Sequence, residues 1–527
     1  MVEQFEFVLL LLVAVVCLEL VARWLRLPPA AAFILGGGAL TFVPGMPEVT
    51  LDPDLVLVLF LPPLLMASAY FTSWRELRQH LGGVLELAVG AVVFTTLAVG
   101  VAVHWAVPGL PWAACFALGA VVSPPDAVAA KAVLQGVRLP RRTLVLLEGE
   151  SLLNDAAGIV LFRFAVAAVL TGTFNAWQAT ASFGLLALGG VVVGAVVGLL
   201  GSGLLRLLRS VELGIITTLL MPWAAYILAE RLHLSGVIAT VATGLVLGWY
   251  QHEIFTADGR RTGTAVWQIM TYLLEALVFV LIGLSLHGVL VRLGGLDDAW
   301  QVLGRPVLWV IVAVILSRFA WILAADGARA LSRRLRGRAA HAPNWAASVV
   351  MGWAGMRGVV TLAVALSVPE EMPGRDLILV AAFAVILVTV LLQGTTLGVL
   401  IRLLGLAEDG HGGASTLTRA QAEARMAATQ LAAVEQLARN TDGSTRHPRL
   451  LEQYQYRARA AARFSAEADT LAGERGAHFD VVLAAVAAGR AEVLRLHRSG
   501  EIHDEVLHAL EHDLDLQELM AGRLRGG

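Results

Sequence analysis

Long apolar runs, separated by short polar segments, fill the chain up to about Leu404. Most of these runs are apolar on every side, and a helix of about 20 apolar residues crosses a membrane. We therefore predict an all-α polytopic membrane protein with about thirteen transmembrane helices. The predicted spans are residues 7–25, 29–44, 54–71, 84–106, 112–134, 143–171, 183–207, 211–230, 233–250, 267–291, 306–331, 344–368 and 376–404.

The pattern of the chain changes after Leu404. Residues 405–417 are rich in Gly and polar side chains, which is typical of a linker. Residues 418–527 are rich in Ala, Glu and Arg, and their apolar residues recur at helical spacing. The sequence therefore predicts a transmembrane domain over 1–404 and a cytoplasmic helical tail over 418–527. The predicted tail helices are residues 418–439, 447–474, 478–499 and 501–523.

The composition supports a membrane protein. Hydrophobic residues make up 57% of the chain and charged residues 15%, whereas ordinary globular chains are about 25% charged. The formal net charge of −2 indicates no nucleic-acid partner, and the apolar runs indicate contact with membrane lipids. Cys17 and Cys115 both lie inside apolar runs, so we expect neither a disulfide nor a metal site from them. No cofactor is expected.

Arginine residues gather in every second loop between the predicted spans. Five arginines between residues 329 and 338, for example, follow the span 306–331. By the positive-inside rule, this bias places the N-terminus outside and the tail in the cytoplasm, which requires an odd number of spans. An odd count also allows two six-span repeats of opposite topology, in which the span 112–134 corresponds to the span 344–368.

Two neighbouring spans carry acids at the depth of the membrane. Asp126 follows Ser123-Pro124-Pro125, and the next span contains Glu148, Glu150, Asn154 and Asp155. An ionisable group at this depth is expensive, so it marks a candidate functional site. The prolines interrupt a helix, which is tolerated only where the freed backbone groups are buried in protein or line a cavity. Interrupted helices of this kind carry the ion sites of many secondary transporters.

A carboxylate in the middle of a membrane can hold a proton or a dehydrated cation, but not both. We expect Asp155 to be this group, with an N-cap or a buried ion pair as its alternative role. Na⁺ and Li⁺ are hard cations that prefer oxygen ligands. Asp126, Ser151, the side-chain carbonyl of Asn154 and backbone carbonyls near Ser123 supply such oxygens. Asp126 has capping of a second half-helix as an alternative or additional role.

Three motifs resemble those of a known family. SPPD at 123–126, GESLLND at 149–155 and GMRG at 355–358 occur in this order inside the apolar domain. Together they resemble the core motifs of the monovalent cation:proton antiporter-1 family, over about residues 5–405. The resemblance implies a sodium/proton antiporter of the plasma membrane that serves sodium extrusion and pH homeostasis. It also implies a homodimer with inverted repeats and crossed discontinuous helices.

The resemblance assigns roles to single residues. It implies a Na⁺ site at Asp155 and Asp126, and a structural ion pair between Glu150 and Arg357. The Asn154-Asp155 pair implies electroneutral exchange, one cation for one proton. Arg318 is a second arginine inside an apolar run, open to the same structural role.

The chain departs from the family pattern in the span 54–71. Relatives often carry an acid near Ala67 and Ser68, and this chain has none there. Ser68 or a water would have to replace it, so the ion is less firmly predicted than the antiport reaction. K⁺/H⁺ exchange therefore stays open beside exchange of Na⁺ or Li⁺.

Other classes of protein have less support. A membrane hydrolase is disfavoured because G-x-S-x-G and H-E-x-x-H are absent, and His252-Glu253 lacks the second histidine. A cation channel needs a continuous pore, and a transporter-like receptor has no positive signal. In the tail, His508 and His512 are four residues apart, which favours a solvated helix face over a metal site. Proton sensing by the tail histidines is a hypothesis.

Overall fold

The computed structural model describes residues 2–25, 27–42, 53–126, 140–172, 176–208, 210–292, 296–335, 345–406, 417–438 and 445–525. These residues form helices and their connections, and no β-strand occurs among them. They divide into two compact units, Met1–Asp409 and Gly410–Gly527. The predicted all-α fold class is confirmed. Most of the predicted linker, residues 407–416, lies outside the described residues.

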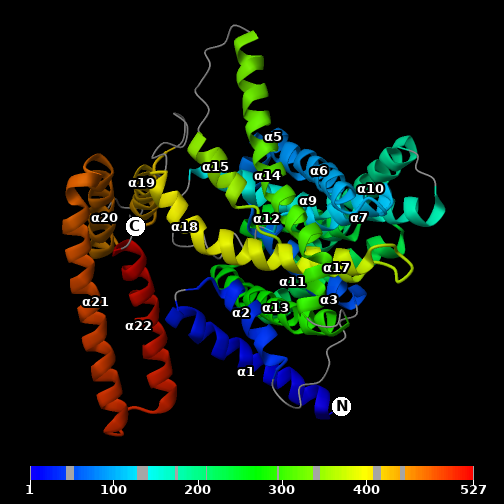
Figure 1. The fold of residues 1–527 in the computed structure, drawn as a ribbon. Helices are drawn as coiled ribbons and strands as arrows, with labels where there is room; N and C mark the ends of the chain where they lie inside the picture. Colours follow the sequence, from blue (N-terminus) through cyan, green and yellow to red (C-terminus); the bar gives the residue numbers. More distant parts are fainter. Residues whose placement is uncertain are drawn as a thin grey trace. The chain divides into compact units, whose positions relative to one another are not determined.

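The first unit consists of helices joined by short connections (Figure 1). Two of its segments, η1 and η2, are π-helical turns within longer helices. The elements are α1 (Val2–Leu25), α2 (Pro29–Leu40), α3 (Pro53–Phe71), α4 (Trp74–Gln79), α5 (Leu81–Leu85), η1 (Glu86–Ala91), α6 (Val92–Ala106), α7 (Trp112–Val122), α9 (Arg141–Thr171), α10 (Ala176–Leu207), α11 (Val211–Arg231), α12 (Gly236–Ile254), α13 (Ala257–Arg292), α14 (Leu296–Leu335), α15 (Trp345–Trp353), α16 (Val359–Leu366), α17 (Arg375–Val388), η2 (Thr389–Gln393) and α18 (Gly394–Leu403).

Eight helical segments among the described residues are long and apolar enough to cross a membrane. They are Glu6–Leu25, Leu81–Ala106, Arg142–Thr171, Ala181–Leu207, Val211–Arg231, Ala257–Ser285, Leu303–Ser332 and Arg375–Leu403. Three shorter apolar helices are Pro29–Leu40, Leu55–Phe71 and Trp112–Val122. A polytopic membrane fold is therefore confirmed, while the count of thirteen crossings stays a prediction. Residues 127–134 of the predicted span 112–134 lie outside the described residues.

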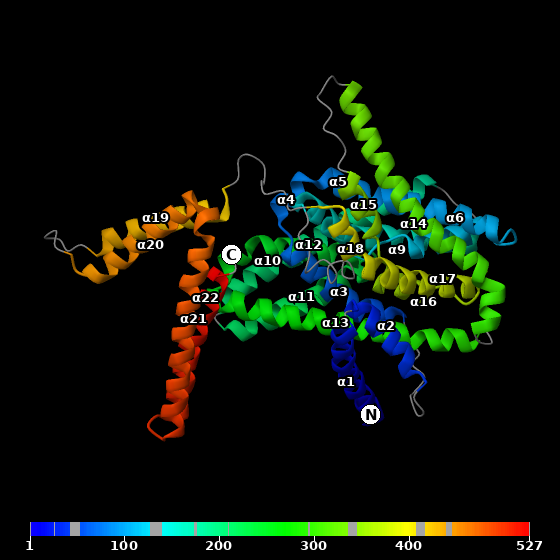
Figure 2. The same cartoon turned by 60° about the vertical axis from the view of Figure 1, so that its left-hand side comes forward.

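The helices of this unit pack as two bundles. The first bundle comprises α1, α2, α3, α10, α11, α12 and α13, and the second comprises α5, η1, α6, α7, α9 and α14 to α18. In Figure 2, α1, α2 and α13 lie on the lower side of the unit, and α5, α6 and α15 on the upper side. The bundles meet mainly where α3, α12 and α13 contact α9, α16 and α17.

Close helix packing inside the first bundle depends on small residues. Gly194 of α10 lies so close to the carbonyl oxygen of Ala239 in α12 that a side chain would collide with it. Lipid provides no hydrophobic drive for helix association, so membrane helices associate through close packing. Small residues allow this close approach.

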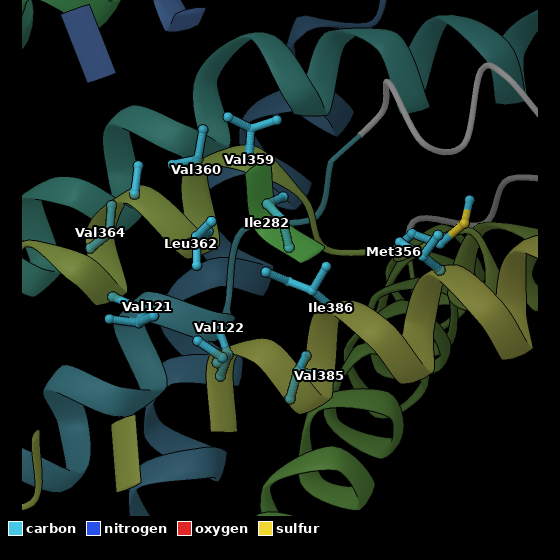
Figure 3. Packing of buried hydrophobic residues seen from close by; sticks show 14 of the residues in the cluster. Val121, Val122, Ile282, Met356, Val359, Val360, Leu362, Val364, Val385 and Ile386 are labelled. Atoms are coloured by element: carbon cyan, nitrogen blue, oxygen red, sulfur yellow. The ribbon is translucent and has the colours of Figure 1, made fainter. Parts of the chain in front are cut away.

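Aliphatic side chains from both bundles fill the centre of the unit. Val122 of α7, Leu362 of α16, Ile386 of α17 and Ile282 of α13 are all buried in one cluster (Figure 3). The same cluster includes Val122, where α7 ends, and Met356, which lies between α15 and α16. The core of the unit therefore holds the irregular backbone in place.

The second unit consists of two helical hairpins: α19 (Arg419–Leu437) with α20 (Pro448–Ala466), and α21 (Ala468–Arg498) with α22 (Asp504–Arg525). A capping box of Thr418 and Gln421 begins α19. The predicted helix ends near 474 and 478 are wrong, because the chain bends at Glu467 and α21 runs unbroken through the glycines at 473 and 476.

Candidate functional site

The site is built where two interrupted helices touch. α7 ends at Val122 and is followed by non-helical residues up to Asp126, while residues 354–358 separate α15 from α16. The backbone N–H of Asp126 donates a hydrogen bond to the carbonyl oxygen of Met356, at 2.7 Å. The two interruptions therefore satisfy part of each other's backbone, which irregular chain at membrane depth requires.

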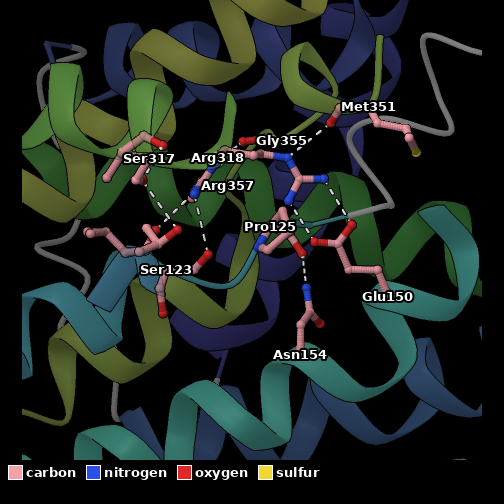
Figure 4. Close-up of polar contacts among 12 residues, drawn as sticks. Ser123, Pro125, Glu150, Asn154, Ser317, Arg318, Met351, Gly355 and Arg357 are labelled. Atoms are coloured by element: carbon pink, nitrogen blue, oxygen red, sulfur yellow. Dashed lines mark hydrogen bonds and ion pairs between the residues drawn. The ribbon is translucent and has the colours of Figure 1, made fainter. Parts of the chain in front are cut away.

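Arg357 lies in the second interruption and binds the end of α7. Its guanidinium, in a residue only 1% exposed, donates from Nε to the Val122 carbonyl at 2.9 Å and from Nη2 to the Ser123 carbonyl at 3.3 Å. It also donates to the carbonyl of Gly355 (Figure 4). The last carbonyls of a helix lack intrahelical partners and carry partial negative charge. Arg357 therefore neutralises the C-terminus of a half-helix inside the protein.

Glu150 of α9 forms a two-pronged ion pair with Arg318 of α14. Nη1 of Arg318 lies 2.6 Å from Oε1 and Nη2 lies 2.9 Å from Oε2, and both residues are at most 3% exposed. Nε of Arg318 donates to the Met351 carbonyl in α15, at 3.0 Å (Figure 4). This pair thus joins α9, α14 and α15, and it satisfies both buried charges.

The predicted ion pair between Glu150 and Arg357 is wrong in its partner. The hydrogen bonds of Glu150 go to Arg318, and those of the Arg357 guanidinium go to backbone carbonyls. Glu150 still lies near enough to Arg357 for electrostatic attraction. The physical reason is that the unpaired carbonyls of α7 take up the donors of Arg357, which leaves the carboxylate to the other buried arginine.

Asn154 and Asp155 lie side by side on α9. The Nδ2 of Asn154 donates to the Pro125 carbonyl, so this amide fixes α9 to the first interruption (Figure 4). The Oδ1 of Asn154 is buried with no hydrogen-bond partner in the described part of the chain. Asp155 is only 8% exposed, and its carboxylate lies close enough to that of Asp126 for their charges to repel.

A small cavity, about 10 Å³, lies beside these residues. By size it suits one water molecule or one small ion. Its lining residues are Pro125, Asp126, Leu147, Glu150, Ser151, Arg318 and Ala354. Asp126, Glu150 and Ser151, three of the residues singled out in the sequence, therefore face one space, and Asn154 and Asp155 lie beside it.

Gly358 leaves room for the carboxylate of Asp126. A Cβ at position 358 would overlap Oδ2 of Asp126. The second glycine of the GMRG motif therefore allows the close approach of Asp126. The motif brings Arg357 and Asp126 to the place where the two interrupted helices touch.

Hydroxyl groups extend the polar region away from the cavity. Ser123 accepts a hydrogen bond from Thr96 of α6 at 3.2 Å and donates to the Ala120 carbonyl at 3.2 Å. Ser317 of α14 donates to Thr95 of α6 at 3.3 Å. We did not predict the roles of Thr95, Thr96 and Ser317, because single hydroxyl residues in apolar runs commonly bond to their own helix.

Comparison with known proteins identifies the family. The family model described as "sodium/hydrogen exchanger, transmembrane" matches residues 8–403. The chain belongs to this family. The exchanger is 32% identical to the uncharacterized Na⁺/H⁺ exchanger YjcE of Escherichia coli, over 90% of each chain. It is 34% identical to the sodium, potassium, lithium and rubidium/H⁺ antiporter of Bacillus pumilus, over 76% of this chain and 61% of that one.

A solved structure shares the fold of this exchanger. The sodium proton antiporter MjNhaP1 of Methanocaldococcus jannaschii matches with a TM-score of 0.59 and 20% sequence identity. The match covers 76% of this chain and 100% of that chain. The family match and the relatives above confirm the predicted resemblance to cation:proton antiporters, and the protein is a transporter rather than an enzyme.

Proposed function

We propose that this exchanger is a secondary antiporter that trades Na⁺ for H⁺ at Asp155. The observation that carries the proposal is a buried carboxylate, Asp155, held beside Asp126 at the contact of two interrupted helices. An acid in that position is costly when charged and alone, so a proton or a cation must accompany it. Competition between the two ligands for one carboxylate couples their movement.

The groups around Asp155 suit a small cation. Asp126, Ser151 and the unpartnered Oδ1 of Asn154 offer the oxygen ligands that a hard cation requires. Among the described residues, no group of three or more His, Cys, Asp or Glu side chains gathers to hold a metal ion, and oxygen from a few side chains and carbonyls fits a monovalent cargo.

The two buried arginines have partners other than Asp155. The guanidinium of Arg357 binds carbonyls at the C-terminal end of α7, and that of Arg318 binds the carboxylate of Glu150. Neither guanidinium therefore needs Asp155 as a partner. Asn154 is neutral and adds no second titrating group beside Asp155. We therefore propose electroneutral exchange, one Na⁺ for one H⁺.

We also propose how the site reaches both sides of the membrane. The second bundle carries Asp126, Asp155 and the interrupted helices, and it meets the first bundle along α3, α12 and α13. Movement of one bundle against the other would expose Asp155 to each side in turn. We place the exchanger in the plasma membrane as a homodimer, with its N-terminus outside and its tail, 418–527, in the cytoplasm.

The test measures cation-driven proton movement in proteoliposomes. A pH gradient is trapped, Na⁺, Li⁺ or K⁺ is added in turn, and an internal dye reports pH with and without a voltage clamp. We expect Na⁺ to dissipate the gradient at the same rate in both conditions. Asp155→Asn should remove this activity, whereas Asp258→Asn, which changes an exposed acid of α13, should preserve it.

Several outcomes would contradict the proposal. Gradient loss with no cation dependence would indicate a leak, and exchange that persists in Asp155→Asn would remove Asp155 from the mechanism. A response to K⁺ alone would make K⁺ the cargo. That result would point to Ala67 in α3, where relatives often carry an acid and this chain has a buried alanine.

A further inference from the structure

One ion pair joins the two bundles. Nη2 of Arg163 in α9 lies 3.6 Å from Oε2 of Glu230 at the end of α11. Every other ion pair between described side chains of the first unit lies inside a single bundle. Those pairs are Arg23–Glu19, Arg206–Glu253, Arg261–Asp258, Arg318–Glu150, Arg329–Glu86 and Arg329–Asp326.

Glu230 is fixed by its own bundle. Its Oε1 accepts a hydrogen bond from the backbone N–H of Gly236, the first residue of α12, at 3.2 Å. Gly236 in turn packs against the ring of Tyr226, so closely that a side chain there would collide. The turn between α11 and α12 thus holds the carboxylate in place, and Arg163 is the partner that travels with the other bundle.

Arg163 lies on the same helix as the proposed cargo carboxylate. It follows Asp155 by eight residues, about 12 Å along α9. Glu148 and Glu150 lie on the opposite side of Asp155 along the helix. The pair therefore bridges the bundles at one side of the site only, the side that the predicted orientation places outside.

We propose that Arg163 and Glu230 form a latch that closes one side of the exchanger and must part in each transport cycle. The proposal rests on the antiport function above. If α9 moves relative to α11 and α12, the pair exists in one access state and not in the other. An interaction that differs between two states shifts their populations, so the latch sets how readily the site opens on that side.

The latch is suited to reversible use. The side chains are 58% and 34% exposed, so the protein encloses neither charge when the pair opens. Exposed ion pairs shift an equilibrium by up to about fivefold, which biases it without locking it. The fully buried Glu150–Arg318 pair, by contrast, holds elements of one bundle permanently together.

The main test is a reversible cross-link. Cysteines replace Arg163 and Glu230 in a background with Cys17→Ser and Cys115→Ala, and a bifunctional methanethiosulfonate bridges them in proteoliposomes. We expect the bridge to stop Na⁺/H⁺ exchange and a reductant to restore it. The matched control bridges cysteines in place of Arg206 and Glu253, an ion pair of the same type at 3.4 Å inside one bundle. Exchange should continue in the control.

The outcomes distinguish failure of the latch from failure of the antiport function on which it rests. If the untreated cysteine variant and the wild type both fail to exchange, the antiport proposal fails. If they exchange and the bridged Arg163–Glu230 variant also exchanges, the latch fails and the antiport proposal stands. Inhibition of the control to the same degree would also overturn the latch, since the reagent would then act by rigidifying any helix pair.

A second test uses charge alone. Arg163→Gln and Glu230→Gln should each change the turnover rate in the same direction, by about two- to fivefold, the range an exposed pair supports. The double variant should change it no further, because both substitutions remove one interaction. Strictly additive effects would show that the two residues act separately.

Discussion

At the residue level, the buried charges of the site are compensated in two ways. Glu150 and Arg318 neutralise each other with two hydrogen bonds, whereas the charge of Arg357 is met by backbone carbonyls. An arginine stays charged at any pH a protein meets, so each must find acceptors. The carbonyls at the end of α7 lack intrahelical partners because that helix stops at Val122.

The first prediction concerns the free energy of unfolding. Glu150→Gln should destabilise the exchanger by about 3–5 kcal/mol, because it leaves the charge of Arg318 buried and uncompensated. The double variant Glu150→Gln/Arg318→Met should recover most of this loss, since it removes both charges. Thermal unfolding of the purified protein in detergent measures the effect.

A matched control belongs to the same measurement. Glu253→Gln removes an exposed ion pair with Arg206 and should cost no more than about 1 kcal/mol. Equal destabilisation by Glu150→Gln and Glu253→Gln would mean that burial of the first pair adds nothing. A double variant as unstable as Glu150→Gln would mean that Glu150 acts by some means other than its charge.

The sequence predicted the residues of the site better than their pairings. Asp126 and Glu150 stood out because acids are rare in apolar runs, and Ser151 was expected to supply an oxygen; all three line one cavity. The partner of Glu150 was not predictable in this way. Arg318 and Arg357 both lie in apolar runs, and nothing in the order of residues says which guanidinium an unpaired helix end will occupy.

At the level of elements, the interrupted helices could be predicted and the π-helical turns could not. Prolines after Ser123 predicted one interrupted helix, and the family resemblance implied a second that crosses it. The helices stop at Val122 and between Trp353 and Val359. The π-helical turns η1 and η2 were not predictable, because ordinary apolar residues form them. Such turns depend on the packing around a helix rather than on its own residues.

The second prediction tests the contact between the interrupted helices. Gly358→Ala should abolish or strongly reduce exchange, because the new methyl group would displace the carboxylate of Asp126. Na⁺-driven proton movement in proteoliposomes measures the loss. Gly398→Ala is the matched control, since a Cβ at position 398 in α18 meets no atom within 4 Å.

Stability and activity should separate in this experiment. We expect Gly358→Ala to reach the membrane and unfold within a few degrees of the wild type, because only one side chain has to move. Full activity in Gly358→Ala would show that the position of Asp126 beside Gly358 is not needed for exchange. Equal loss in Gly398→Ala would point to a general effect of helix substitutions.

For the whole molecule, the sequence indicated two parts but not two bundles. A change of composition after Leu404 predicted a separate tail, and the chain divides into compact units at Asp409. The division of the first unit was not predictable. Its helices are apolar on every side, so their patterns do not say which neighbours they choose, and close contacts such as Gly194 against α12 decide it.

The last prediction concerns the tail unit and pH. Arg495 of α21 lies 2.7 Å from Glu492, and this hydrogen bond lowers the pKa of the Glu492 carboxyl from its ordinary 4.5. A carboxyl whose pKa is lowered by folding stabilises the folded state above its unfolded pKa, and this contribution disappears as the pH falls through the folded value. The Tm of the isolated unit, Gly410–Gly527, should therefore be higher at pH 7 than at pH 3.

The variant Glu492→Gln isolates this contribution. It should lower the Tm slightly at pH 7 and by less at pH 3, because the wild-type carboxyl loses its charge as the pH falls through its lowered pKa. Added salt should shrink the difference because the pair is exposed. Glu452→Gln, on the exposed surface of α20, is the control and should leave the Tm unchanged at either pH. A Tm difference for Glu492→Gln that is the same at both pH values would show that its carboxylate charge does not stabilise the tail.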